Sequence, residues 1–148
     1  MIFSQDNDDL TWAGTVKFDP LAALFAGIVW HGFNMVVSWV PYISHNIGIP
    51  VEAEFIIANE IIGFGIMTGI EAVPIPVKEK NGLYVTAVAG AIFLNNEVKF
   101  GAKALIGYQW IFGKGFVLNP SIGALYTGFT GFSFTYSFDI GFAYRKRH

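Results

Sequence analysis

The stretch Phe132-Ser-Phe-Thr-Tyr-Ser-Phe-Asp-Ile-Gly-Phe-Ala-Tyr-Arg145 decides the fold of this chain. Apolar side chains, most of them aromatic, occupy every second position from Phe132 to Tyr144, and small, polar or charged side chains lie between them. Because successive side chains of a β-strand point to opposite faces, the pattern predicts one long strand with an apolar and a polar face. Soluble strands usually have about five or six residues, whereas a tilted strand needs about 9–11 to cross a bilayer. The predicted strand is long enough to cross a bilayer.

The same alternation occurs upstream, from Val98 to Phe112. Aliphatic and aromatic side chains fill one face, and the other face carries Lys99, Lys103 and Gln109 among small and apolar residues. Transmembrane β-strands have this pattern because one face meets lipid and the other meets the lumen. The two stretches therefore predict two strands of the same kind.

The composition favours a membrane protein that is not helical. Of the 148 residues, 53% are hydrophobic and only 14% are charged. A membrane helix needs about 18 or more consecutive apolar residues, but the long apolar stretch 47–77 contains four glutamates and three prolines. Only helices and closed β-barrels satisfy every backbone polar group inside a bilayer. Since a helix is excluded, a β-barrel is the remaining structure for a membrane protein.

Turn-forming residues divide the chain into eight predicted strands. We expect them near residues 14–27, 32–42, 48–58, 61–73, 82–94, 98–112, 116–128 and 131–145. The predicted fold is all-β, an eight-stranded antiparallel up-and-down transmembrane β-barrel over residues 14–145, with an N-terminal segment 1–13 and a basic tail 146–148. Pro20 and Pro120 fall inside predicted strands, where we expect bulges. Residues 1–4 are interpreted as the remnant of a signal peptide.

Aromatic residues are predicted to form a girdle at each end of the barrel. An even number of strands places both termini at one end, which export would leave in the periplasm, and interfacial Trp and Tyr should cluster where strands meet each surface. The expected periplasmic girdle is Trp12, Trp39, Tyr42, Tyr84, Tyr108, Trp110 and Tyr144, and the opposite girdle includes Trp30 and Tyr126.

The charged residues within the predicted strands share the lumen face. The acids are Asp19, Glu52, Glu54, Glu71 and Asp139, and the bases are Lys17, Lys99, Lys103 and Arg145. Side chains fill the interior of an eight-stranded barrel, and an unpaired charge there would cost several kcal/mol. The near-balance of charge therefore predicts an ion-paired plug. The alternative is an ion path lined by Glu52, Glu54 and Glu71, for which eight strands leave little room.

No motif indicates catalysis or a cofactor. Gly63-x-Gly65-x-x-x-Gly69 has the wrong spacing for a dinucleotide loop and fits alternate glycines on a narrow inner face. The three histidines are too far apart in the predicted topology for a metal site, and no Ser–His pair typical of a lipase or acyltransferase is evident. The chain has no cysteine, and its net charge of −2 gives no footprint for nucleic acid. We expect no enzyme activity, no cofactor and no nucleic-acid partner.

The predicted strands resemble those of the small outer-membrane barrels of the OmpA, OmpX and OmpW type. The resemblance rests on Val16-Lys-Phe-Asp-Pro-Leu21, on Leu105-Ile-Gly-Tyr-Gln109 and on the strand from Ser137 to Arg145. It implies a bacterial outer membrane, contact with the lipid bilayer and recognition of the last strand by the barrel-assembly machinery. Such families usually end in an aromatic residue, whereas this chain continues to His148.

Three functions remain open from the sequence. The leading hypothesis is a monomeric barrel with a structural or membrane-integrity role and a narrow, filled lumen. The resemblance to OmpW-type barrels allows instead a channel for small or apolar solutes, which requires a gap in the wall or an incompletely filled lumen. A soluble, lipocalin-like binder of an apolar ligand has the opposite sidedness, with the Phe132–Tyr144 stripe inside. Alternation by itself does not distinguish the two sidednesses.

Overall fold

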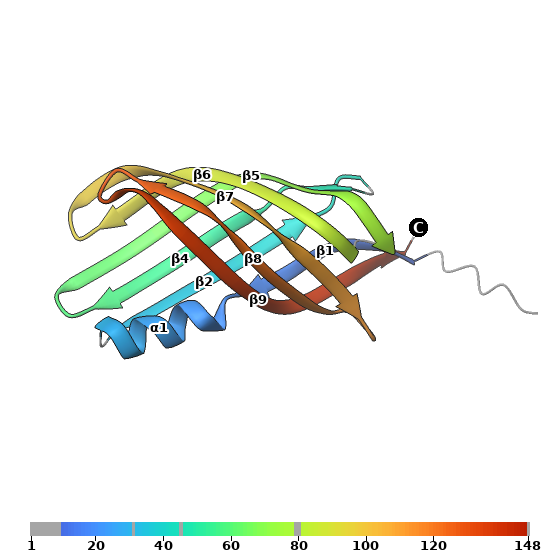
Figure 1. Ribbon diagram of the computed structural model, residues 1–148, viewed down its shortest axis with the longest axis horizontal. Helices are drawn as coiled ribbons and strands as arrows, with labels where there is room; N and C mark the ends of the chain where they lie inside the picture. The colour runs from blue at the N-terminus through green and yellow to red at the C-terminus, as the bar shows by residue number, and fades with distance from the viewer. Residues whose placement is uncertain (1–9, 31, 45, 79–80, 148) are drawn as a thin grey trace, which may run out of the picture.

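The described residues form one β-barrel with a short helix at its side (Figure 1). The computed structural model describes residues 10–30, 32–44, 46–78 and 81–147. In chain order the elements are β1 (Leu10–Phe18), α1 (Pro20–Trp30), β2 (Phe33–Pro41), β3 (Ile47–Gly48), β4 (Val51–Ala58), β5 (Ile61–Lys78), β6 (Asn81–Leu94), β7 (Glu97–Phe112), β8 (Phe116–Thr127) and β9 (Gly131–Arg147).

Antiparallel pairing closes the barrel. Around the wall the order is β1, β2, β4, β5, β6, β7, β8 and β9, and β9 pairs back with β1 from Leu10↔Arg147 to Phe18↔Ile140. The two-residue β3 pairs with β5, as β4 does, and Ile49 and Pro50 separate it from β4. We therefore treat β3 and β4 as one interrupted wall strand. The predicted eight-stranded antiparallel barrel is confirmed.

Most strand positions agree with the predictions. The two stretches with the clearest alternation are β7 and β9, and β5 continues to Lys78, five residues beyond its predicted end. The predicted reversals at Asn59 and Asn95 contain backbone φ angles of 50° at both residues. Asparagine adopts this left-handed conformation more readily than most residues, which explains why the chain turns there.

The first predicted strand, 14–27, is wrong in its second half, because β1 ends at Phe18 and α1 begins at Pro20. Asp19 caps the helix: its Oδ1 accepts the backbone N–H groups of Leu21 at 2.9 Å and Ala22 at 3.1 Å. An aspartate at the N-cap followed by proline at the first helical position is a strong start signal for a helix. Pro20 is therefore a helix start and not a bulge.

Two further boundaries differ from the expected ones. The wall begins at Leu10 rather than at residue 14, and its last strand includes Lys146 and Arg147, which we expected in a tail. At Pro120 the β7–β8 ladder is interrupted between Gly107↔Ser121 and Trp110↔Leu118. The register is the same on both sides of the interruption, so Pro120 removes hydrogen bonds without forming a bulge.

The barrel is apolar outside and polar inside. Phe132 and Phe134 are 84% and 73% exposed, whereas Lys17, Glu52 and Glu71 are buried. Neighbouring strands approach closely at glycines on the inner face: a Cβ added to Gly69 on β5 would lie 1.9 Å from the carbonyl oxygen of Ala87 on the paired strand β6. In the described part of the chain, no helix is long and apolar enough to cross a membrane.

Candidate functional site

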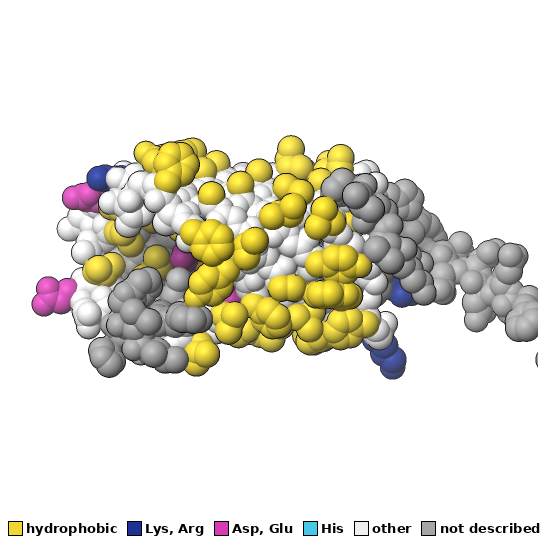
Figure 2. Space-filling view, in the orientation of Figure 1, with side chains coloured by type: hydrophobic (Ala, Val, Ile, Leu, Met, Phe, Trp, Pro, Cys, Tyr) yellow, Lys and Arg dark blue, Asp and Glu magenta, His cyan; other side chains and the backbone are white. Residues whose placement is uncertain are grey.

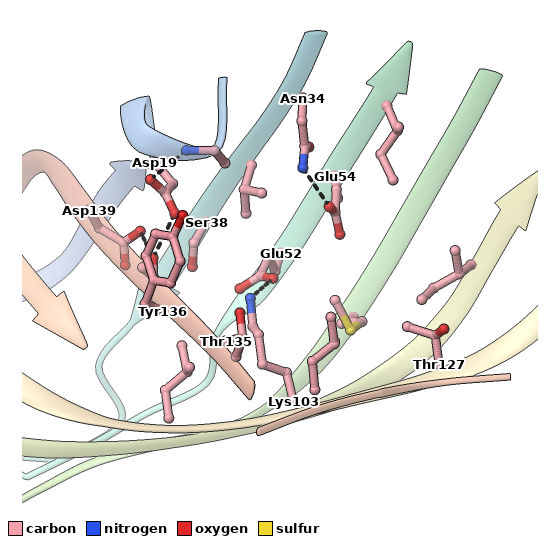
Figure 3. Close-up of a pocket in the computed structure, with 18 of the residues that line it drawn as sticks. Asp19, Asn34, Ser38, Glu52, Glu54, Lys103, Thr127, Thr135, Tyr136 and Asp139 are labelled. Atoms are coloured by element: carbon pink, nitrogen blue, oxygen red, sulfur yellow. Dashed lines mark hydrogen bonds and ion pairs between the residues drawn. The ribbon is translucent and has the colours of Figure 1, made fainter. Parts of the chain in front are cut away.

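A cavity of about 400 Å³ occupies the part of the barrel away from the chain termini. Leu94, Thr127 and Phe129, near the β6–β7 and β8–β9 turns, lie at its rim, whereas the Leu10↔Arg147 pair is at the other end of the wall. Figure 3 shows that side chains of several strands converge on this space. Its charged members are Lys17, Asp19, Glu52, Glu54, Lys103 and Asp139.

A buried ion pair forms the base of the cavity and joins β1 to β5. Lys17 Nζ lies 2.8 Å from Glu71 Oε2, and the two side chains are 3% and 2% exposed. Thr86 Oγ1 donates to the same carboxylate oxygen at 3.3 Å. With its amide oxygen turned toward the ammonium, Asn119 accepts from Lys17 Nζ at 3.0 Å. We call Lys17, Glu71, Thr86, Asn119 and Gln109 the inner plug.

The inner plug continues into an apolar seal at the end that carries the termini. The side-chain amides of Gln109 and Asn119 lie 3.2 Å apart, and the Gln109 amide also lies 3.2 Å from the Tyr42 hydroxyl. The seal itself consists of four buried side chains, Val40, Ile111, Val117 and Ala143. Ile111, Val117 and Ala143 pack together in one cluster, which occupies the lumen at this end.

On the cavity side of the inner plug, the polar groups are less deeply buried. Lys103 Nζ forms an ion pair with Glu52 Oε1, and this pair is part-buried. Glu54 Oε1 accepts from Asn34 Nδ2 at 3.1 Å. Figure 3 draws both contacts as dashed lines, from Lys103 to Glu52 and from Asn34 to Glu54. Asn34 is neutral, and the positive charge that acts on Glu54 is that of Lys103, which is already paired with Glu52.

Two further carboxylates share one serine. Ser137 Oγ lies 3.0 Å from Asp19 Oδ2 and 2.6 Å from Asp139 Oδ1. A hydroxyl group has one hydrogen, so Ser137 donates to only one of these carboxylates at a time. Asp19 has a second role, because it also caps α1. The cavity thus contains two close acids whose hydrogen bonds are with neutral groups.

The charges inside the barrel do not balance as we expected. Among the described residues, the interior acids are Asp19, Glu52, Glu54, Glu71 and Asp139, and the interior bases are Lys17 and Lys103. Two residues predicted to join them lie elsewhere. Lys99 is at the rim, 3.9 Å from Glu97, with 43% of its side chain exposed, and Arg145 is exposed near the end of β9. Alternation assigned both residues to the inner face, but they lie too close to the strand ends to be enclosed.

The wall is interrupted beside the cavity. The β1–β9 ladder ends at Phe18↔Ile140, although β9 extends nine residues further to Gly131. On the other side, the β1–β2 ladder ends at Phe18↔Val37, and one further hydrogen bond joins Asp19 N–H to the Val36 carbonyl at 3.1 Å. Beyond this point, α1 packs against β2 and β9 in place of a strand. Figure 1 shows the helix along this side of the barrel.

The predicted aromatic girdles are only partly on the outer surface. Trp39, Trp110 and Tyr144 are exposed, and the Trp39 indole N–H donates to the Tyr144 hydroxyl at 2.9 Å. Tyr84 is 1% exposed and lies inside, with Lys17 Nζ 5.5 Å from its ring centre. Tyr84 is therefore not a girdle residue.

The remaining girdle residues fall into three groups. Tyr42 contacts the interior through Gln109, so it too departs from the prediction. Tyr108 and Tyr126 are half-buried, and both contact an exposed aromatic ring, of Trp110 and Phe100 respectively. The side chains of Trp12 and Trp30 lie outside the described part of the structure.

Of the remaining sequence motifs, the structure places the glycines of β5. Gly63 and Gly65 are buried on the inner face of β5, as alternate glycines should be. Among the described residues, no three metal-ligating side chains form a cluster. His31, His45 and His148, and the proposed signal remnant 1–4, lie outside the described residues.

Four uncharged polar residues at the site were not predicted as members of the lumen network: Asn34, Thr86, Asn119 and Ser137. Each lies on the inward-facing set of positions of its strand, so the alternation could have indicated it. Gln109 was expected on the lumen face, and the structure places it there.

No family model matches the chain, and no curated protein matches it.

Proposed function

We propose that this chain is an integral β-barrel of a bacterial outer membrane, with a structural role there and no catalytic one. The observation that carries the proposal is the sidedness of the wall. Large apolar side chains such as Phe55, Ile70, Ile106 and Phe142 are exposed on its outside, while ion pairs lie within. A lipid-facing barrel needs this arrangement, and a water-soluble barrel that binds an apolar ligand needs the reverse.

The extent of the apolar surface supports a lipid environment. The largest apolar patch on a soluble monomer is typically about 300–600 Å². In Figure 2, hydrophobic side chains spread over the middle of the visible face, and the charged ones lie mainly toward the two ends. Exposed apolar residues come from β1, β2, β4, β5, β6, β7, β8 and β9. A band of this kind around a barrel matches the hydrocarbon layer of a bilayer.

The closed lumen favours a structural role over conduction. The inner plug is fully buried, and Val40, Ile111, Val117 and Ala143 fill the barrel between it and the termini. An ion crossing the barrel would have to separate Lys17 from Glu71, which would leave charges uncompensated at a cost of several kcal/mol. We therefore propose that the barrel does not conduct ions.

The first test is refolding with and without a membrane mimic. The chain, purified from inclusion bodies in urea, is diluted into buffer and into liposomes, and the far-UV circular dichroism and flotation of each sample are recorded. We expect precipitation in buffer and a β spectrum, with flotation that survives a carbonate wash, in liposomes. A monodisperse β-sheet protein in buffer that does not float would disprove the membrane assignment.

Planar-bilayer conductance tests the closed lumen separately. We expect no stepwise conductance from the wild-type protein, and conductance events from a variant with the ion pair and seal opened, Lys17→Ala with Val117→Gly. Regular conductance steps from the wild-type barrel would contradict the structural role.

A second candidate is the passage of small or apolar solutes. The 400 Å³ cavity favours it, because the lumen is incompletely filled on one side of the inner plug. Complete passage would still require the inner plug to rearrange. Uptake of a small solute into proteoliposomes, compared with empty liposomes, distinguishes this candidate from the structural one.

A further inference from the structure

The cavity reaches the outside of the barrel through its side. Phe134 and Tyr136 belong to the outward-facing set of β9 residues, whereas Thr135, Ser137 and Asp139 belong to the inward-facing set. Residues of both sets line the cavity. A continuous wall would separate the two faces, so the space must pass the edge of β9. This edge lies where the ladder with β1 has ended.

The opening lies between β9 and β2, beside α1. Val36 and Asn34 line the cavity from β2, and Ala22 lines it from the first turn of the helix. The helix is apolar along its length, from Pro20 to Trp30, and Leu24 is exposed. In Figure 2 the wall is hollowed toward this end of the barrel, and acidic atoms are visible inside the hollow. A molecule dissolved in the surrounding apolar phase could pass this opening without crossing the rim.

The walls of the cavity are mostly apolar above a charged base. Five neighbouring strands, β4 to β8, contribute aliphatic side chains and one thioether to these walls: Ile56, Met67, Ile92, Leu94, Leu105 and Leu125. Its volume of about 400 Å³ falls within the usual range for small-molecule sites, roughly 300–1,000 Å³. A hydrocarbon chain would replace water against these walls.

The charged side chains at the base of the cavity determine which sign of charge a bound ligand should carry. Lys103 pairs with Glu52, and Lys17 pairs with Glu71 below the cavity. The cavity carboxylates Glu54, Asp19 and Asp139 form hydrogen bonds with Asn34, Ser137 and the backbone of α1. Lys103 and Lys17 act on Glu54 and Asp139 only while each is paired with another acid, so the base of the cavity has more acids than bases. Buried charges need charged partners or metal ions, and a positively charged group placed here would supply one.

We propose that this cavity binds an amphiphile with a positively charged head group, which reaches it from the membrane through the opening between β2 and β9. The head group lies near Glu54 and Asp139, and the apolar tail lies along the aliphatic walls toward the opening. The proposal rests on the proposed function, because the membrane is the source of the ligand. The three observations that carry it are the cavity, the interrupted wall and the excess of carboxylates.

The test uses three fluorescent amphiphiles with the same alkyl chain and the same environment-sensitive dye. Their head groups are trimethylammonium, hydroxyl and sulfate. Each probe is titrated into lipid nanodiscs that contain the refolded protein and into empty nanodiscs. We expect a saturable signal with the cationic probe, at least tenfold tighter than with the neutral probe, and no saturable signal with the anionic probe. Equal affinities for the three probes would overturn the proposal.

Isosteric variants test the role of the carboxylates. Glu54→Gln and Asp139→Asn should each weaken binding of the cationic probe at least threefold, and the double variant at least tenfold, with the neutral probe unchanged. Glu97→Gln is the matched control, because Glu97 lies at the β6–β7 turn with a side chain 68% exposed. Cationic binding that is unchanged in the double variant would contradict the assignment of the head group.

A bulkier residue in α1 tests the route. Ala22→Phe places a ring where the helix borders the cavity and should slow association of the cationic probe at least tenfold. Ala23→Phe, one position along the helix, is the control, because Ala23 is not among the residues that line the cavity. Equal association rates in the two variants would contradict access through the wall.

Flotation and circular dichroism of every sample separate the two proposals. A barrel that inserts into nanodiscs but shows no preference for the cationic probe refutes this inference and leaves the proposed function standing. A chain that remains outside the membrane refutes both.

Discussion

Two regions of the same lumen differ in how their buried charges are compensated. In the inner plug, Lys17 and Glu71 form a pair from which water is excluded, with Thr86 and Asn119 as additional partners. In the cavity, Glu52 has a lysine, but Glu54 and Asp139 have neutral hydrogen-bond partners. The two regions use the same residue types on the same inward-facing positions, so residue type does not explain the difference.

The continuity of the barrel wall explains why charges are compensated differently in the inner plug and in the cavity. At the height of the inner plug each wall strand lies between two neighbouring strands, although Pro120 interrupts the β7–β8 pairing there, and Lys17 itself lies opposite Ser38 on β2 and Gly141 on β9. Two residues later the strand gives way to α1, and the wall opens. Where the wall is complete, an unpaired charge cannot reach water and must be neutralised. Where the wall is interrupted, solvent or a ligand can compensate a carboxylate, so an excess of acids is tolerated.

The largest expected effect is the removal of the cation from the inner plug. Lys17→Met leaves Glu71 buried without its partner and should lower the free energy of unfolding by about 3–5 kcal/mol. Urea titration of the protein in liposomes measures the loss, with the exposed turn residue Lys114→Met as the control. A loss no greater than that of the control would mean that the inner plug is not closed to water.

In the complete part of the wall, a larger side chain in place of glycine should also lower the stability of the barrel. Gly69→Ala forces a methyl group against the Ala87 carbonyl and should cost about 1–3 kcal/mol. Gly65→Ala, on the same face of the same strand, meets its nearest neighbour, Glu54 Cβ, at an ordinary 3.5 Å and should be tolerated. The same urea titration compares the two, and equal stabilities would show that β5 and β6 are free to move apart.

The ion pair of the cavity should matter less than that of the inner plug. Lys103→Met leaves Glu52 next to a cavity that water can reach, so we expect a loss of about 1–3 kcal/mol, smaller than for Lys17→Met. Measuring both variants in one urea series tests the comparison directly. If Lys103→Met were the more destabilising change, the cavity would have to be as dry as the inner plug.

The smallest expected effect concerns the helix that interrupts the wall. Asp19→Ala removes the acceptor of two backbone N–H groups and should cost about 1 kcal/mol, while Asp19→Asn keeps a capping oxygen and should remain near the wild type. Hydrogen exchange of the Leu21 and Ala22 amides measures the effect locally, because both donate to Asp19 Oδ1. Unchanged exchange in Asp19→Ala would show that α1 does not depend on its cap.

Much of the wall could be predicted because each strand carries its own signal. The alternation in β7 and β9 and the asparagine turns at Asn59 and Asn95 are local features, and the structure reproduces them. The error at α1 was also local: Asp19-Pro20 followed by Leu-Ala-Ala-Leu is a helix start, but the apolar run was interpreted as a continued strand. Short apolar runs fit both structures, so periodicity alone does not separate them.

The candidate site was less predictable because its contacts are long-range. Lys17 and Glu71 are 54 residues apart, and Ser137 and Asp19 are 118 apart. Which acid meets which base depends on the register of strands that are not neighbours in the chain. The count of nine charged residues on one face suggested balance, but Lys99 and Arg145 lie near the strand ends and are exposed to solvent.

The sequence by itself determined the two sets of alternating side chains, the number of strands and the absence of cysteine chemistry, because these follow from local periodicity and composition. Only the tertiary structure decided which set points inward, since alternation is unchanged when the two faces are exchanged. Closure into a narrow barrel separates them: the interior accommodates glycine, serine and paired charges, and the row of phenylalanines on β9 faces outward. The cavity, too, belongs to the tertiary structure, because it exists where one wall strand stops early and a helix takes its place.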